Sequence, residues 1–110
     1  MKRFEVYSGN TLVGCSDLEG LDRSMATACG TLVPTDEYAR VQGAVIALRG
    51  VDQGKLDLSV KLSGGGLIRC DFIHIADHSD EVAVAGIEVS AHGISTPTVD
   101  ELFPLARLDG

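Results

Sequence analysis

Three residues of the kinds that bind metals or transfer protons recur four positions apart: Cys70, His74 and His78. Thiolate and imidazole are the ligands that zinc prefers. On a continuous strand, however, neighbours in this series lie about 13 Å apart, at about 3.3 Å per residue. They cannot surround one ion unless the strand ends near Asp77 or His92 joins from the next strand. We therefore predict no metal and no cofactor, and name these three residues as the ligands if a metal does bind.

Carboxylates crowd the same stretch, and His78 is flanked by Asp77 and Asp80. A histidine beside a carboxylate can work as a general base. Acidic residues also keep ordinary hairpin turns solvated, and no Ser or Cys stands at the spacing of a known nucleophile motif. We assign no catalytic residue, and keep a small metal-dependent hydrolase using His74 and His78 as an alternative hypothesis.

A second group of candidates lies in the polar stretch 16–24, which is followed by Met25. Its carboxylates do not have the spacing of a calcium-binding EF-hand loop. Loops on a rigid scaffold carry contacts more often than core strands do. We predict that ligand or partner contacts are made by six residues, Asp17, Glu19, Asp22, Met25, His74 and His78.

Charge and composition argue against several classes of partner. The chain has 9 basic and 16 acidic residues, a net charge of −7, which disfavours nucleic acid and anionic membranes as partners. No Trp is present, and aromatic residues make up 5% of the chain, so platforms for base stacking are scarce. No apolar run approaches the roughly 18 residues that span a bilayer.

The cysteines and the first residues of the sequence indicate in which cellular compartment the protein works. Three cysteines, an odd number, are widely spaced, and the basic start is followed directly by Phe4-Glu5-Val6 rather than by an apolar signal segment. Reduced thiols are typical of cytosolic proteins. We expect a cytoplasmic protein, and a bacterial source is our guess.

Strand patterns dominate the chain. A hairpin is predicted over Arg3 to Cys15 around Gly9-Asn10, with Ser8 facing Thr11, Val6 facing Val13 and Phe4 facing Cys15. Met25 to Val33 is expected to be a strand in which Gly30 marks a bulge or a close backbone approach.

The central stretch, 55–94, predicts three further strands. Apolar residues alternate over 55–62, the glycine turn 63–66 follows, and strands are expected over 67–77 and 82–91. A two-residue turn at Ser79-Asp80 would place His74 opposite Ala85 and His92 opposite Leu67.

Two helices are predicted. The longer begins after a Thr35 cap and presents Tyr38, Val41, Val45 and Leu48 on one face. Gly43 within it would let a strand or another chain approach closely. The shorter covers Val99 to Phe103 behind a capping box of Thr98 and Glu101. The apolar tail after it is expected to dock on its own core or on a partner.

At 110 residues the chain fits a single domain, 1–110. We expect the α+β class: a mainly antiparallel sheet of five or six strands, one amphipathic helix and a short C-terminal helix. The leading functional hypothesis is a non-enzymatic interaction or small-ligand-binding module that self-associates as a homodimer or larger homo-oligomer. An accessory subunit of a larger complex, binding a protein partner through residues 17–22, is the third hypothesis.

Overall fold

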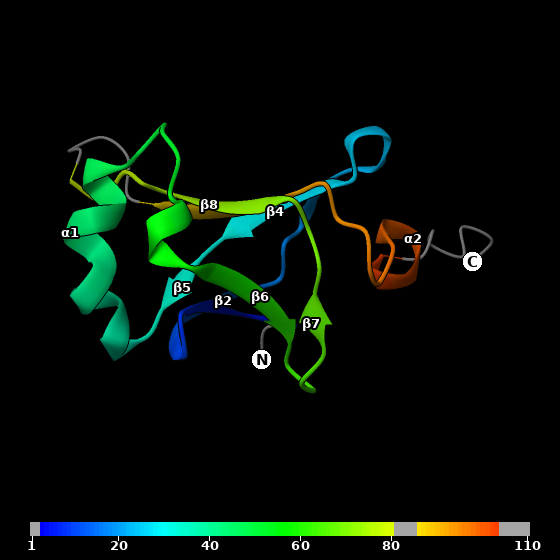
Figure 1. Ribbon diagram of the computed structural model, residues 1–110, viewed down its shortest axis with the longest axis horizontal. Coiled ribbons are helices and arrows are strands. Elements are labelled where there is room, and N and C mark those ends of the chain that lie inside the picture. The colour runs from blue at the N-terminus through cyan, green and yellow to red at the C-terminus, as the bar shows by residue number, and fades with distance from the viewer. Residues whose placement is uncertain (1–2, 81–85, 104–110) are drawn as a thin grey trace.

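The structure, a computed structural model, describes residues 3–80 and 86–103. These residues form two antiparallel sheets whose buried side chains meet in one cluster, which confirms the α+β class. In Figure 1, β4 and β8 lie in the upper layer and β2 and β6 in the lower one, with α1 at one end and α2 at the other. The strands are divided between sheets of five and four strands, rather than joined in one sheet of five or six.

The five-stranded sheet has the order β5-β2-β1-β6-β7. Its hairpin of β1 and β2 turns at Gly9 and Asn10 as predicted, with Ser8 opposite Thr11. The expected pairing beyond that point is wrong by one residue, because a bulge at Val13 places Gly14 opposite Val6. The bounds of its strands are β1 Phe4–Ser8, β2 Thr11–Ser16, β5 Val33–Pro34, β6 Leu58–Leu62 and β7 Leu67–Ile68.

The four-stranded sheet has the order β3-β4-β9-β8. Its strands are β3 Gly20–Asp22, β4 Thr27–Thr31, β8 Phe72–Asp77 and β9 Ile87–His92. The strand predicted over 67–77 is therefore two strands, since β7 pairs with β6 and β8 belongs to the other sheet. The apolar phase changes between Cys70 and Ile73 because the chain crosses from one sheet to the other there.

The pairing of β8 with β9 also differs from the prediction. His74 lies opposite Ser90 and Phe72 opposite His92, so the pairs His74 with Ala85 and His92 with Leu67 are wrong. The reason is the length of the connection: β8 ends at Asp77 and β9 begins at Ile87, too far apart for a two-residue turn. Residues 81–85, which include part of the strand predicted over 82–91, lie outside the described residues.

The main helix begins with a 3-10 turn, η2 (Asp36–Tyr38), and continues as α1 (Ala39–Ala47). The predicted apolar face packs inward, since Tyr38 and Val45 are buried and the core also contacts Val41 and Leu48. Thr35 occupies the predicted N-cap position, but its hydroxyl donates to the carbonyl of Leu12 at 2.7 Å and makes no cap hydrogen bond to the helix. No strand of the described chain approaches Gly43, since no described atom lies within 4 Å of a Cβ placed there.

The C-terminal helix α2 (Val99–Leu102) has the predicted capping box, and it docks on its own chain. Val99 and Leu102 are buried, and the ring of Phe103 lies 5.7 Å from that of Phe4. The Arg3 guanidinium lies over both rings and donates to the carbonyl of Leu102 at 2.6 Å. Residues 104–110, the rest of the predicted tail, lie outside the described range.

Candidate functional site

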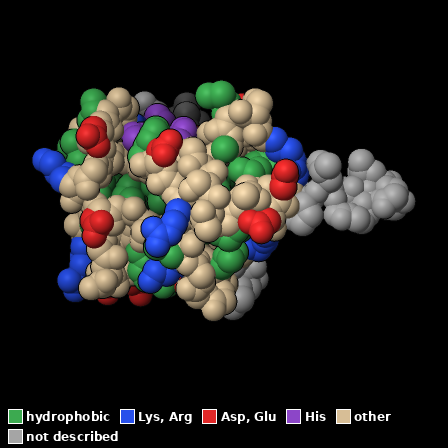
Figure 2. Space-filling model, turned by 45° about the vertical axis from the view of Figure 1, so that its right-hand side comes forward, with side chains coloured by type: hydrophobic (Ala, Val, Ile, Leu, Met, Phe, Trp, Pro, Cys, Tyr) green, Lys and Arg blue, Asp and Glu red, His purple; other side chains and the backbone are tan. Residues whose placement is uncertain are grey.

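His74 and His92 lie on the outer face of the four-stranded sheet, and His78 lies just after the end of β8. Ile73, Ile75 and Asp77 of β8 point inward, so Phe72, His74 and Ala76 point outward. Their partners on β9 are His92, Ser90 and Glu88, which extend the same rows. His78 follows two residues after Ala76, and Figure 2 shows histidine side chains together at the upper edge of the molecule.

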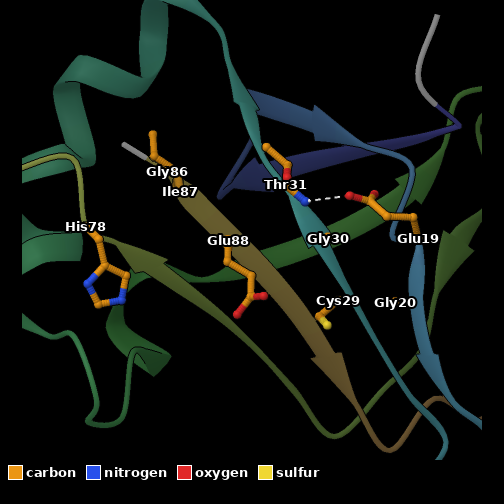
Figure 3. A pocket seen from close by; sticks show the side chains of 9 residues that line it. All are labelled: Glu19, Gly20, Cys29, Gly30, Thr31, His78, Gly86, Ile87 and Glu88. Atoms are coloured by element: carbon orange, nitrogen blue, oxygen red, sulfur yellow. Dashed lines mark hydrogen bonds between the residues drawn. The ribbon is translucent and has the colours of Figure 1, made fainter. Parts of the chain in front are cut away.

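A cavity of about 430 Å³ lies at one end of this face (Figure 3). We call it the sheet-face cavity, and it is lined by Glu19, Gly20, Cys29, Gly30, Thr31, His78, Gly86, Ile87 and Glu88. Glu19 is held there by the backbone N–H of Thr31, which donates to its carboxylate at 3.3 Å. The predicted close approach at Gly30 is confirmed, since a Cβ there would lie 2.8 Å from the Cα of Leu18.

The thiol in this cavity is unsuited to nucleophilic chemistry. Burial, together with the negative charges of Glu88 and Glu19, raises the pKa of Cys29. A thiol attacks as the thiolate, so these carboxylates keep Cys29 in its less reactive protonated form.

A larger cavity runs between the segment 50–57 and the edge strand β8. We call this cavity of about 770 Å³ the edge cleft, and its lining residues are Gly50, Val51, Asp52, Gln53, Gly54, Asp57, Leu58, Asp71, Phe72, Ile73 and His74. The 3-10 turn η3 (Gly54–Leu56) forms part of the segment. Buried Gln53 fixes the segment to β8, because its amide accepts from the N–H of Ile75 at 2.7 Å and donates to the carbonyl of Ile75 at 2.8 Å.

An aromatic ring is presented at the edge cleft. Phe72 is 57% exposed, and its ring stacks flat on that of His92, with centroids 4.4 Å apart and an interplanar angle of 10°. His92 does not line the cleft, so it supports the ring from the other side. The stack holds an exposed apolar surface in a defined orientation.

The polar groups of the edge cleft are mainly acidic. Asp52, Asp57 and Asp71 line it, and no Lys or Arg does so among the residues described. The Nε2 atom of His74 accepts a hydrogen bond from the N–H of Gly50 at 3.3 Å. This hydrogen bond ties the side chain of His74 to the segment 50–57.

The predicted contact residues are distributed over separate places. His74 lines the edge cleft, whereas His78 and Glu19 line the sheet-face cavity. The remaining two acids line neither cavity and bond to backbone groups. Asp17 accepts from the N–H of Arg3 at 3.0 Å. Asp22 caps the 3-10 turn η1 (Arg23–Met25), and hydrogen bonds led by that from Ser24 lower the pKa of its carboxyl.

The residues named for the hydrolase alternative lie in separate places. Cys70, His74 and His78 do not gather, and no group of three His, Cys, Asp or Glu residues within 3–80 and 86–103 is arranged to hold a metal ion. Burial, then the charge of Asp71, raises the pKa of the Cys70 thiol. That residue packs against the core.

One further pair has the residue types of a nucleophile and its base. The hydroxyl of Ser90 lies 2.9 Å from Nε2 of His92. Acyl transfer also needs free donors for a developing oxyanion. Strand β9 is paired with β4 and β8 on its two sides, which uses the backbone N–H groups around Ser90. We interpret the pair as a polar contact on the sheet surface.

Sequence reasoning missed three residues of the edge cleft, Phe72, Asp52 and Asp57. Phe72 is an apolar residue on the face of β8 that otherwise carries polar side chains, and this was the only sign of its exposure. A strand with both faces buried would show the same sequence pattern.

Comparison of the chain with protein-family models, with curated proteins and with solved structures gave no match. In the described part of the chain, no helix has the length and apolar character needed to cross a bilayer.

Proposed function

We propose that the chain is a non-enzymatic small-ligand-binding module and that the edge cleft is its binding site. The observation that carries the proposal is the exposed ring of Phe72, supported by His92, at a cavity of about 770 Å³. Ligand sites typically have about 300 to 1,000 Å³ and combine apolar walls with a few fixed polar groups. Val51, Leu58 and Ile73 supply the apolar walls, and the carboxylates and His74 supply the polar groups.

The role of each residue follows from its place in the cleft. Gln53 positions the wall by bonding both backbone groups of Ile75. The side chain of His74 fixes the start of the same wall through Gly50. A cleft held by such bonds is largely formed before a ligand enters, which reduces the entropy lost on binding.

Replacing Phe72 with alanine should abolish small-ligand binding while leaving the fold intact. More than half of the ring is exposed. Its loss should therefore lower the free energy of unfolding by no more than about 1 kcal/mol. The measurement is ligand-observed NMR with a fragment library of neutral, cationic and anionic compounds, run on the natural chain and on Phe72→Ala.

Leu67→Ala provides the matched control, because Leu67 is 47% exposed but lies on β7 in the other sheet. Fragments should bind the natural chain and Leu67→Ala alike. If no fragment binds, or if the hits bind Phe72→Ala equally well, the edge cleft is not a ligand site and the proposal fails.

A second proposal concerns self-association in the cytoplasm. Met25 is 66% exposed on η1, and this part of the chain projects from the upper right of the sheets in Figure 1. We propose that Met25 contacts a second copy of the chain. Met25→Ser keeps the Asp22 cap, which bonds to the backbone N–H of Met25 and not to its side chain.

Sedimentation velocity over a range of protein concentrations tests this contact. The natural chain should form dimers that Met25→Ser weakens about tenfold, the equivalent of about 1.4 kcal/mol. Val51→Ser, which changes another exposed apolar residue, should leave the dimer unchanged. A natural chain that stays monomeric at all concentrations would contradict the proposal.

A further inference from the structure

We infer that the ligand of the edge cleft is a small organic cation with an apolar body, such as a primary amine on a hydrocarbon or aromatic frame. This inference rests on the proposed function, because it names the class of ligand that the same cleft takes.

Charge is the first argument. Asp52 and Asp57 line the cleft, and no Lys or Arg does so among the described residues. Asp71 also lines it, although its carboxylate lies against Gly93. A cleft lined by one sign of charge concentrates ions of the opposite sign and repels those of its own sign.

The apolar surface narrows the class further. Phe72 offers its ring, and the negative face of an aromatic ring attracts a cation, most strongly when the cation is desolvated. Val51, which is 55% exposed, and Ile73 offer aliphatic contacts in the same cleft. A strongly hydrated metal ion gains little from such surfaces, and no three ligating side chains are arranged for one in the described chain. An organic ammonium group with an apolar body uses both the carboxylates and these walls.

Two of the carboxylates can be neutralised without disturbing the backbone. Oδ1 of Asp52 accepts from the N–H of Gly54 at 2.7 Å, and the side-chain oxygen of an asparagine can accept the same bond. Asp57 has a φ of +51°, in the left-handed region where asparagine is also well tolerated. The double variant Asp52→Asn/Asp57→Asn therefore tests charge separately from fold.

The experiment uses three probes that share one aromatic ring and differ in charge: benzylamine, benzyl alcohol and benzoate. Amide chemical shifts are followed by two-dimensional NMR during each titration. Benzylamine should shift the amides of 50–54 and 71–74 in a saturable way, with a dissociation constant of about 1 mM for so small a ligand. Benzyl alcohol should bind about tenfold more weakly, and benzoate should produce no saturable shift.

The double variant should weaken benzylamine binding about tenfold. Its matched control is Asp36→Asn/Glu88→Gln, which removes the same charge at two exposed positions outside the cleft and should bind as the natural chain does. Benzoate or benzyl alcohol binding the cleft as tightly as benzylamine, or a double variant with unchanged affinity, would overturn the cation class while the proposed function stood. If no probe shifts the cleft amides and the fragment library yields no hit, the proposed function falls with it.

Discussion

Asp77→Ala should lower the free energy of unfolding by about 3 to 5 kcal/mol, because it removes a buried acceptor shared by three residues and leaves the buried hydroxyl of Tyr38 without it. Asp77 is fully buried. Its carboxylate accepts from Tyr38 Oη at 2.6 Å and Gln42 Nε2 at 3.1 Å, and from the N–H and hydroxyl of Ser79 at 2.8 and 2.5 Å. These bonds join the start of the main helix to the end of β8. Urea denaturation followed by circular dichroism measures the loss.

Asp77→Asn separates the lost charge from the lost volume. The asparagine oxygen can still accept from Ser79, and its NH₂ group can donate to the Tyr38 hydroxyl, but it then faces the NH₂ group of Gln42. We expect a loss of about 1 to 3 kcal/mol, smaller than that of the alanine variant. If both variants unfold at the same urea concentration as the natural chain, this network does not stabilise the fold.

The same carboxylate makes stability depend on pH. Burial alone would raise the pKa of Asp77, but the hydrogen bonds from Ser79, Tyr38 and Gln42 together outweigh burial and hold the pKa below its ordinary value. The unfolded chain therefore binds this proton more readily than the folded chain does. The stabilisation is fully present above the unfolded pKa of about 4, and it is lost as the pH falls through the lower folded pKa. Asp77→Asn should remove this part of the acid sensitivity.

The fold could be predicted in part because local signals suffice for local structures. Gly9-Asn10 specifies a hairpin, and Thr98 with Glu101 specifies a helix start, by bonds between residues a few positions apart. The division into two sheets depends on where the chain crosses over between β7 and β8. After Cys70 the apolar residues switch from even to odd positions because the chain crosses to the other sheet. A bulge within one sheet would produce the same switch, so the sequence alone did not identify the crossing.

The candidate sites were harder to predict because their side chains are brought together by strand pairing and by contacts between residues far apart in the sequence. His74 was named for its spacing to Cys70 and His78, yet its partners come from β9 and from Gly50, far away in the sequence. The acids of residues 17–22 were named for their charge, although Asp22 caps a turn within its own segment. Asp52 and Asp57 looked like parts of ordinary connections, and they line a cleft because Gln53 and His74 attach their segment to β8.

Gln53→Met should lower the free energy of unfolding by about 2 to 4 kcal/mol, since it keeps the volume of the side chain and removes both bonds to Ile75. Gln53 is 4% exposed and Ile75 is fully buried, so water cannot replace those bonds without opening the structure. The Gln53 amide also acts as a cap on the edge of β8, where unpaired backbone groups favour pairing with another chain. Hydrogen exchange of the Ile75 amide should become faster in the variant.

Lys55→Met gives the control, because it adds the same side chain at an exposed neighbouring position and breaks no bond to β8. Its stability and the exchange of Ile75 should match those of the natural chain. Gln53→Met should in addition weaken ligand binding at the edge cleft, since the wall formed by 50–57 loses its attachment. Slow exchange of the Ile75 amide in Gln53→Met would mean that another group holds this edge. The cleft would then not depend on Gln53 for its shape.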